Sequence, residues 1–143
     1  MMPFQSYLGI MSSMIDLKAI KDLTRAEIDD LEQRCFKDCI ENDGHLTYKG
    51  QDGPRYAQIS FSLRAKRYQM RKAQLSLFLK LKEVDFDMAS WTDQMSTSHL
   101  CHKKACLKPE HLILETYEMN RERDGCHRNR QCFGHKDSPP CLL

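Results

Sequence analysis

The feature that most constrains this chain is the crowding of cysteine and histidine toward its C-terminal end. Its 143 residues include seven Cys and six His, and most of them lie in the last third of the sequence. A chain of this length buries only one modest core, so groups that cross-link or bind metal are needed as a further source of stability. We therefore expect a single compact domain over residues 23–143, preceded by a loosely held arm over residues 1–22.

A secreted disulfide framework is the alternative to metal binding. The cysteine count is odd and histidines alternate with the cysteines, which favours metal. The N-terminal residues lack the basic segment and continuous apolar run of an export signal. No run of 18 or more apolar residues predicts a membrane span. We therefore expect an intracellular, reducing compartment, which is the nucleus in a eukaryotic cell, and no membrane partner.

The last segment of the chain contains a complete set of four zinc ligands. Cys126, Cys132, His135 and Cys141 offer the sulfur and imidazole groups that zinc binds in a tetrahedron. The residues between them are few and polar, so a bound ion is the feature that would order this segment. The spacing therefore predicts a structural zinc module over residues 126–141.

An incomplete group of zinc ligands lies just upstream, and it is the first cluster along the chain. Cys101, Cys106 and His111 fall within eleven residues, so a fourth ligand must come from elsewhere. Cys39 and Cys35 are both candidates, and we favour Cys39 because it lies at the end of a predicted helix. A closed set of four ligands makes this zinc structural as well.

Sequence patterns upstream of these clusters predict both helices and strands. Thr24 and Glu27 have the spacing of a capping box, and apolar residues at helical intervals predict a helix over residues 25–40. Alternating residues predict strands over residues 56–61 and 66–70. This mixture indicates an α+β fold with a small antiparallel sheet.

Three further segments complete the predicted elements. Residues 71–83 fit a strand or a helix, and their length and their content of Leu, Lys, Gln and Ala favour a helix. Residues 98–100 are expected to end a strand, and residues 112–123 to form a helix. We therefore expect helices that flank the small sheet.

Positive charge is concentrated between Leu63 and Lys82, where no acidic residue occurs. Such a stripe is typical of a surface that follows a phosphate backbone, but it is equally typical of an ordinary solvated face. The sequence leaves both interpretations open. The basic residues are Arg64, Lys66, Arg67, Arg71, Lys72, Lys80 and Lys82.

His99 and Asn120 lie on either side of the group Cys101, Cys106 and His111 in the sequence. Their side chains suit the hydrolysis of a phosphodiester. An imidazole can take a proton from water near neutral pH, and an Asn carbonyl oxygen can hold Mg²⁺ together with waters and phosphate oxygens. His99 lies two residues before Cys101, so a metal bound there would fix its position. We expect a hydrogen bond to a backbone carbonyl or a side chain to orient this imidazole.

Many residues of the C-terminal part resemble the His-Cys box homing endonucleases. The resemblance is dense from Ser98 to Cys141, and the stretch from Arg67 to Lys72 extends it upstream. The residues that carry it are Ser98, His99, Leu100, Cys101, His102, Cys106, Pro109, His111, Leu112, Glu115, Asn120, Cys126, Cys132, His135 and Cys141.

This resemblance implies a fold, an activity and a set of roles. The fold is a ββα-metal (His-Me finger) core stabilised by two structural Zn²⁺ ions. One ion would be bound by an upstream Cys with Cys101, Cys106 and His111, and the other by Cys126, Cys132, His135 and Cys141. The activity is Mg²⁺-dependent hydrolysis of double-stranded DNA. His99 would be the general base that activates water, Asn120 the protein ligand of one catalytic Mg²⁺, and Arg67 a contact to the scissile phosphate.

The chain also departs from the family. Members dimerise through an extension beyond the second zinc cluster, whereas this sequence stops at Leu143, so a homodimer is left open. The sheet that reads DNA is shorter or poorly matched here. The alternative function is therefore a catalytically inactive, zinc-stabilised DNA-binding module, and a protein-interaction module comes third. The intact His99 and Asn120 favour the enzyme.

Overall fold

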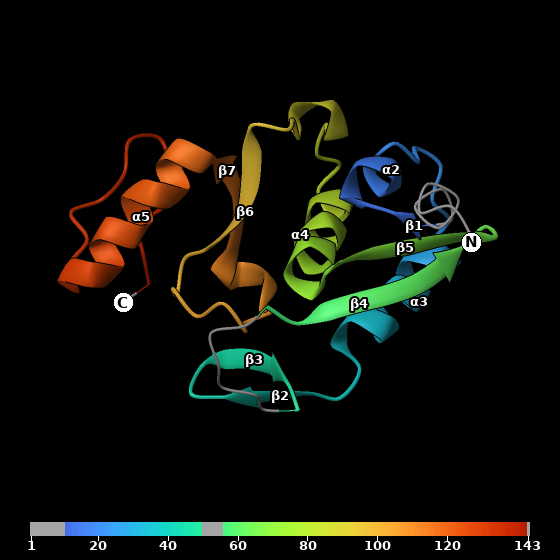
Figure 1. The fold of residues 1–143 in the computed structure, drawn as a ribbon, viewed down its shortest axis with the longest axis horizontal. Helices are drawn as coiled ribbons and strands as arrows, with labels where there is room; N and C mark the ends of the chain where they lie inside the picture. The colour runs from blue at the N-terminus through green and yellow to red at the C-terminus, as the bar shows by residue number, and fades with distance from the viewer. Residues whose placement is uncertain (1–10, 50–55, 143) are drawn as a thin grey trace, which may run out of the picture.

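The computed structural model describes residues 11–49 and 56–142, which form the α+β fold expected from the sequence. Figure 1 shows helix α4 near the middle, with the N-terminal helices on one side and β6, β7 and α5 on the other. The elements are β1 (Met11–Ser12), α2 (Met14–Lys18), α3 (Arg25–Phe36), β2 (Cys39–Asn42), β3 (His45–Tyr48), β4 (Gln58–Leu63), β5 (Lys66–Arg71), α4 (Lys72–Glu83), the 3₁₀ helix η1 (Met88–Ser90), β6 (Met95–His99), the 3₁₀ helix η2 (Pro109–His111), β7 (Leu112–Thr116) and α5 (Tyr117–Asn129).

The described strands pair in three small sheets. The first has the order β1-β5-β4, with β5 antiparallel to β4 and parallel to β1. The other two are the antiparallel pairs β2-β3 and β6-β7. The strands predicted over residues 56–61 and 66–70 are confirmed, and the first of them begins at Gln58.

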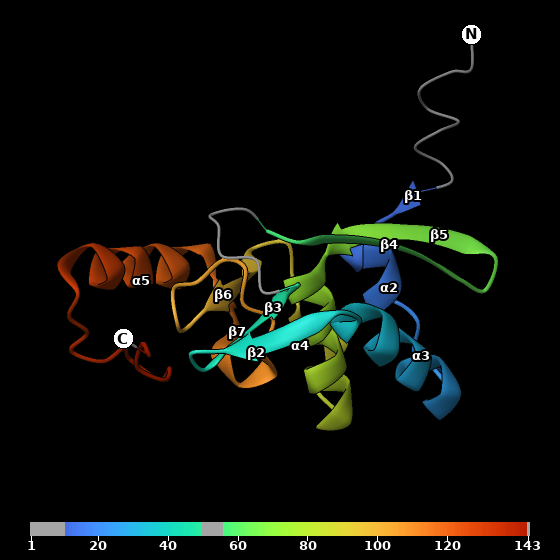
Figure 2. The ribbon, with the colours of Figure 1, turned by 90° about the horizontal axis from the view of Figure 1, so that it is seen from below.

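Strands β6 and β7 and helix α5 form a ββα unit. The strands are antiparallel, with His99 opposite Leu112, and α5 follows β7 directly and lies beside the hairpin (Figures 1 and 2). The hydroxyl of Thr116 caps this helix. The helix predicted over residues 112–123 is wrong in its first part, because that part pairs with β6 and the helix begins at Tyr117.

Helix α4 provides the centre of the hydrophobic core, and the helix predicted over residues 71–83 is confirmed. Its polar side chains hold a later loop. Ser76 Oγ donates a hydrogen bond to the carbonyl oxygen of Leu107 at 2.8 Å, and Lys80 Nζ donates one to that of Pro109 at 3.0 Å. The helix thereby fixes the loop that carries the first cysteine cluster. Its buried apolar side chains are Ala73, Leu75, Leu77, Phe78 and Leu79.

The helix predicted over residues 25–40 ends earlier than expected. The predicted capping box is present, but α3 stops at Phe36. Asp38 has a φ of 58°, which no helix interior tolerates, and the chain turns there into β2. Cys39 is therefore the first residue of a strand and not the end of a helix.

Part of the segment expected to be a loosely held arm belongs to the core. Strand β1 pairs with β5, and α2 buries Met14 and Leu17 against the other helices. Residues 1–10 of the predicted arm lie outside the described residues. Among the described residues, no helix combines the length and the apolar character that crossing a lipid bilayer requires.

Most of the basic stripe over residues 63–82 is engaged within the protein, so neither interpretation describes all of it. Arg64 Nη2 lies 2.7 Å from a Glu27 carboxylate oxygen, and Lys80 binds backbone carbonyls. Lys72 is buried, with its ammonium 4.3 Å from the centre of the Tyr48 ring. The basic residues of the stripe that remain exposed on the sheet are Lys66, Arg67 and Arg71.

Candidate metal centres and active site

Side chains from two parts of the chain, the β2-β3 hairpin and residues 101–111, meet in the first cluster, which consists of His45, Cys101, Cys106 and His111. Their ligand atoms all lie within 4.8 Å of one another, and Cys106 Sγ is 3.5 Å from His111 Nδ1. A tetrahedral zinc ion with bonds of about 2.3 Å to sulfur and about 2.0 Å to nitrogen separates these two atoms by about 3.5 Å. The first cluster therefore fits zinc in donor chemistry and in spacing.

His45 reaches this cluster through the β2-β3 hairpin. Asp43 and Gly44 both have positive φ angles, 53° and 79°, as a two-residue hairpin turn requires, and His45 follows them. The backbone N–H of Leu107 donates to the carbonyl of Leu46 at 2.7 Å, which joins the hairpin to the loop of the first cluster. His45 Nδ1 is buried without a hydrogen-bond partner among the described residues, an arrangement that is costly unless another group interacts with this imidazole.

The structure corrects the predicted fourth member of the first cluster. Neither Cys39 nor Cys35 joins it. Cys35 is fully buried and donates to the carbonyl of Lys72, and this burial raises the pKa of its thiol to about 12. Cys39 points back at the Cys35 carbonyl, with a separation of 3.9 Å, because the end of α3 at Phe36 turns it away. The sequence signal for His45 is the Asp43-Gly44 pair just before it, which is typical of a hairpin turn.

The sulfur atom of Cys106 lies among hydrogen-bond donors. Hydrogen bonds from Cys101 and from the backbone at Leu46 and Lys108 hold the pKa of Cys106 well below its usual range. The thiolate is the form that binds zinc. The hydrogen bonds around Cys106 therefore favour the form of the side chain that binds zinc.

The second cluster consists of the four predicted residues, Cys126, Cys132, His135 and Cys141. His135 Nε2 lies 3.7, 3.3 and 3.4 Å from the sulfur atoms of Cys126, Cys132 and Cys141. These separations scatter around the value of about 3.5 Å that a tetrahedral zinc ion imposes. The second cluster therefore also fits zinc.

Neighbouring groups orient the ligands of the second cluster. Glu122, on α5, lies 2.7 Å from His135 Nδ1, so the opposite nitrogen faces the sulfur atoms. The backbone N–H groups of Cys141 and Gly134 each donate to Cys132 Sγ at 3.4 Å, and they lower the pKa of Cys132 to about 6. A carboxylate behind a histidine ligand is a frequent companion of protein zinc sites.

Arg123 fastens the C-terminal segment to the ββα unit. Its side chain is 1% exposed, and its Nε lies 2.6 Å from Glu115 on β7. The same guanidinium donates to Ser138 Oγ at 2.9 Å, to the Pro139 carbonyl at 2.8 Å and to Cys141 Sγ at 3.5 Å. The second cluster and α5 are thereby held as one unit.

His99 lies at the end of β6 and is buried. Its Nε2 lies 3.0 Å from the carbonyl oxygen of Cys106. Because a carbonyl only accepts, Nε2 carries the ring proton and Nδ1 is left as the basic nitrogen. Burial lowers the pKa of His99 to about 4, so the imidazole is neutral at pH 7. The expected orienting group is therefore the backbone of a first-cluster residue.

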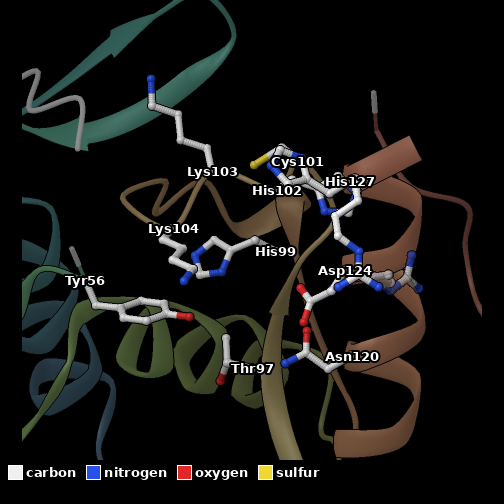
Figure 3. Close-up of a pocket in the computed structure, with 12 residues that line it drawn as sticks. Tyr56, Thr97, His99, Cys101, His102, Lys103, Lys104, Asn120, Asp124 and His127 are labelled. Atoms are coloured by element: carbon white, nitrogen blue, oxygen red, sulfur yellow. The ribbon is translucent and has the colours of Figure 1, made fainter. Parts of the chain in front are cut away.

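His99 and Asn120 line the same pocket, which has a volume of about 690 Å³. Figure 3 shows His99 on the β6 side and Asn120 on helix α5, with Tyr56 facing the imidazole. The ring centres of Tyr56 and His99 are 5.9 Å apart. Lysine side chains at positions 103 and 104 and Arg128 also line this pocket. It combines a neutral imidazole, an amide oxygen and positive charge.

The structure does not bring Arg67 to this pocket. Arg67 lies toward the turn of the β4-β5 hairpin and donates to Ser62 Oγ at 3.3 Å. Arg71, at the other end of β5, stacks on Tyr56 at 3.9 Å, and its charge contributes to lowering the pKa of His99. Sequence reasoning missed Arg71 as the arginine beside the pocket.

A family model described as the zinc-binding loop region of homing endonuclease matches residues 32–141. The match includes both clusters and the pocket residues His99 and Asn120. No curated protein matches this chain.

Proposed function

Since the chain belongs to the family of the zinc-binding loop region of homing endonuclease, we propose that it is a Mg²⁺-dependent endonuclease that hydrolyses phosphodiester bonds of double-stranded DNA. The observation that carries this proposal is the hydrogen bond between His99 Nε2 and the Cys106 carbonyl, in a pocket shared with Asn120. This hydrogen bond supports His99 as a base of defined tautomer, and Asn120 beside it is a group that suits Mg²⁺. Structural zinc in the two clusters would hold this arrangement.

His99 is the general base in this proposal. Its Nδ1 accepts a proton from a water molecule while Nε2 stays bonded to the Cys106 carbonyl. The resulting hydroxide attacks the phosphorus atom, the bond from phosphorus to the 3′ oxygen breaks, and the departing 3′ oxygen takes a proton from water to become a hydroxyl group. A positioned base of this kind contributes about 10²- to 10⁴-fold to a rate.

Asn120 is the protein group that would hold the catalytic Mg²⁺. Its amide is half-buried at the pocket wall, and an amide oxygen is a hard ligand of the kind Mg²⁺ prefers. The bound ion would neutralise charge on the phosphate and on the departing oxygen. The role of Asn120 is to determine where the positive charge of the ion lies in the pocket.

Arg71, rather than Arg67, is assigned to the phosphate that reacts. The guanidinium of Arg71 is held against Tyr56, and Tyr56 lines the pocket. Positive charge at this place opposes the negative charge that grows during attack. Arg67 lies at the far end of β5 and is assigned to phosphates that flank the cleavage site.

The exposed face of the β4-β5 hairpin supports DNA as the substrate. Figure 2 shows this hairpin and α5 along the same side of the molecule, while α2, α3 and α4 cover the other face of the sheet. A two-stranded ribbon fits the major groove of B-DNA, and amide, hydroxyl and guanidinium groups can bond to base edges there. The exposed cross-strand pairs are Gln58 with Arg71, Ser60 with Gln69, and Ser62 with Arg67.

Nicking of supercoiled plasmid by zinc-loaded protein tests the proposal. Open circles should form with Mg²⁺ and should not form when Mg²⁺ is omitted or chelated. Plasmid binding that weakens with salt but never leads to nicking, with any divalent cation, would show a catalytically inactive DNA-binding module instead. The absence of both binding and nicking would contradict both functions.

A further inference from the structure

Asp124 lies one helical turn after Asn120 on α5 and lines the same pocket. Residues four apart on a helix share one face, so both side chains reach the pocket wall together. Figure 3 shows the carboxylate of Asp124 and the amide of Asn120 pointing toward one another. The two residues therefore present carboxylate and amide oxygens on the same side of the pocket, with Asn120 half-buried and Asp124 exposed to solvent.

Among the described residues that line this pocket, Asp124 is the one acidic side chain, and the charged side chains Lys103, Lys104, Arg123 and Arg128 are basic. Within the described part of the chain it forms no ion pair and no side-chain hydrogen bond. Its charge acts on the imidazole of His102, which lies nearby. Its place in the middle of α5 also removes it from the helix N-terminus, where a carboxylate is favoured.

An unpaired carboxylate in a pocket for a polyanion repels the substrate. A divalent cation reverses this effect, because it is attracted to the carboxylate and to the phosphate alike. Mg²⁺ sites in proteins typically combine one or two carboxylates with waters and substrate phosphates. An amide alone is a weak ligand, so the carboxylate supplies the charge that Asn120 lacks.

We propose that Asp124 and Asn120 together form the binding site of the catalytic divalent cation, with Asp124 as its charged ligand. The proposal rests on the proposed nuclease function and adds a protein group to it. The pair should hold a divalent cation in the free protein, before DNA supplies phosphate oxygens.

Mn²⁺ titration of the full, zinc-loaded chain, followed by electron paramagnetic resonance of the free ion, tests this site without DNA. Asp124→Asn keeps the size of the side chain and removes its charge. The Mn²⁺ affinity of this variant should fall at least fivefold. Glu118→Gln is the matched control, because it removes the same charge from an exposed position of α5 outside the pocket, and it should leave the affinity unchanged.

The same variants give a second readout in the plasmid assay. Asp124→Asn should raise the Mg²⁺ concentration that gives half of the maximal nicking rate, and excess Mg²⁺ should restore much of the rate. Zinc content and thermal unfolding of each variant show that the fold is intact.

Equal Mn²⁺ affinity of Asp124→Asn and the unaltered chain, or no Mn²⁺ binding by the unaltered chain, overturns the site. Neither result touches the nuclease proposal, which fails only when the unaltered chain does not nick plasmid with any divalent cation.

Discussion

His99 Nε2 and the carbonyl oxygen of Cys106 are 3.0 Å apart, and this contact ties the candidate base to the first metal cluster. Cys106 offers its sulfur to the cluster and its backbone oxygen to the imidazole. The tautomer and the direction of His99 therefore depend on the loop that a zinc ion would close. Cys106 therefore links the structural metal site to the imidazole that would act as the base.

Removal of the imidazole should abolish most of the activity without unfolding the chain. We predict that His99→Ala lowers the single-turnover rate of plasmid nicking by about 10²- to 10⁴-fold, because the attacking water loses its base. Both zinc ions should remain, because His99 belongs to neither cluster. Undiminished nicking by this variant, with its zinc retained, would contradict the assignment of His99 as the base.

The composition of the first cluster predicts which upstream residue controls zinc content. His45→Ala should leave one zinc ion per chain in native mass spectrometry, because three ligands remain at that site. Cys39→Ser is the matched comparison, and it should keep two ions because its sulfur faces the Cys35 carbonyl. The opposite pattern would return Cys39 to the cluster.

The carboxylate behind His135 should affect how long zinc stays in the second cluster. We predict that Glu122→Gln weakens zinc binding there by about 10- to 100-fold, because the His135 imidazole loses the partner that orients it. Zinc release to a colorimetric chelator measures this effect. Glu118→Gln, on the exposed side of the same helix, should release zinc at the original rate, and equal rates for both variants would remove any role of Glu122.

The buried pair of Arg123 and Glu115 should be sensitive to the loss of one partner. Arg123→Met leaves the Glu115 charge buried without its partner, and we predict a loss of about 3 to 5 kcal/mol in the free energy of unfolding. Replacing Glu115 by Gln as well should recover part of this loss. Chemical denaturation at fixed zinc concentration measures both, and a loss under about 1 kcal/mol for Arg123→Met would show that the pair is not a fastening point.

Local sequence pattern was sufficient for some elements and for one metal cluster. Helix α4 and strands β4 and β5 follow from periodicity and turn residues, which act within a few positions. The second cluster follows from spacing alone, because its four ligands lie within a short polar segment. The capping box of Thr24 and Glu27 likewise predicts the start of α3.

Features that depend on distant contacts were not accessible in the same way. Residues 112–116 form β7 because β6 is available as a partner, and their own sequence also suits a helix. His45 reaches the first cluster only because the chain turns twice, after Phe36 and at Asp43. Most basic residues of the stripe are bound to internal partners that are distant in the sequence, such as Glu27 on α3, which pairs with Arg64.

The central claim is that two clusters of cysteine and histidine bind zinc and thereby give the candidate active site its shape. Native mass spectrometry of the reduced chain, before and after a strong chelator, tests it most directly when amide exchange is followed in parallel. We predict two zinc ions per chain, and rapid exchange over residues 99–142 once the chelator has removed them. A chain that carries no zinc, or that keeps the protection of this segment in the chelator, would contradict the claim.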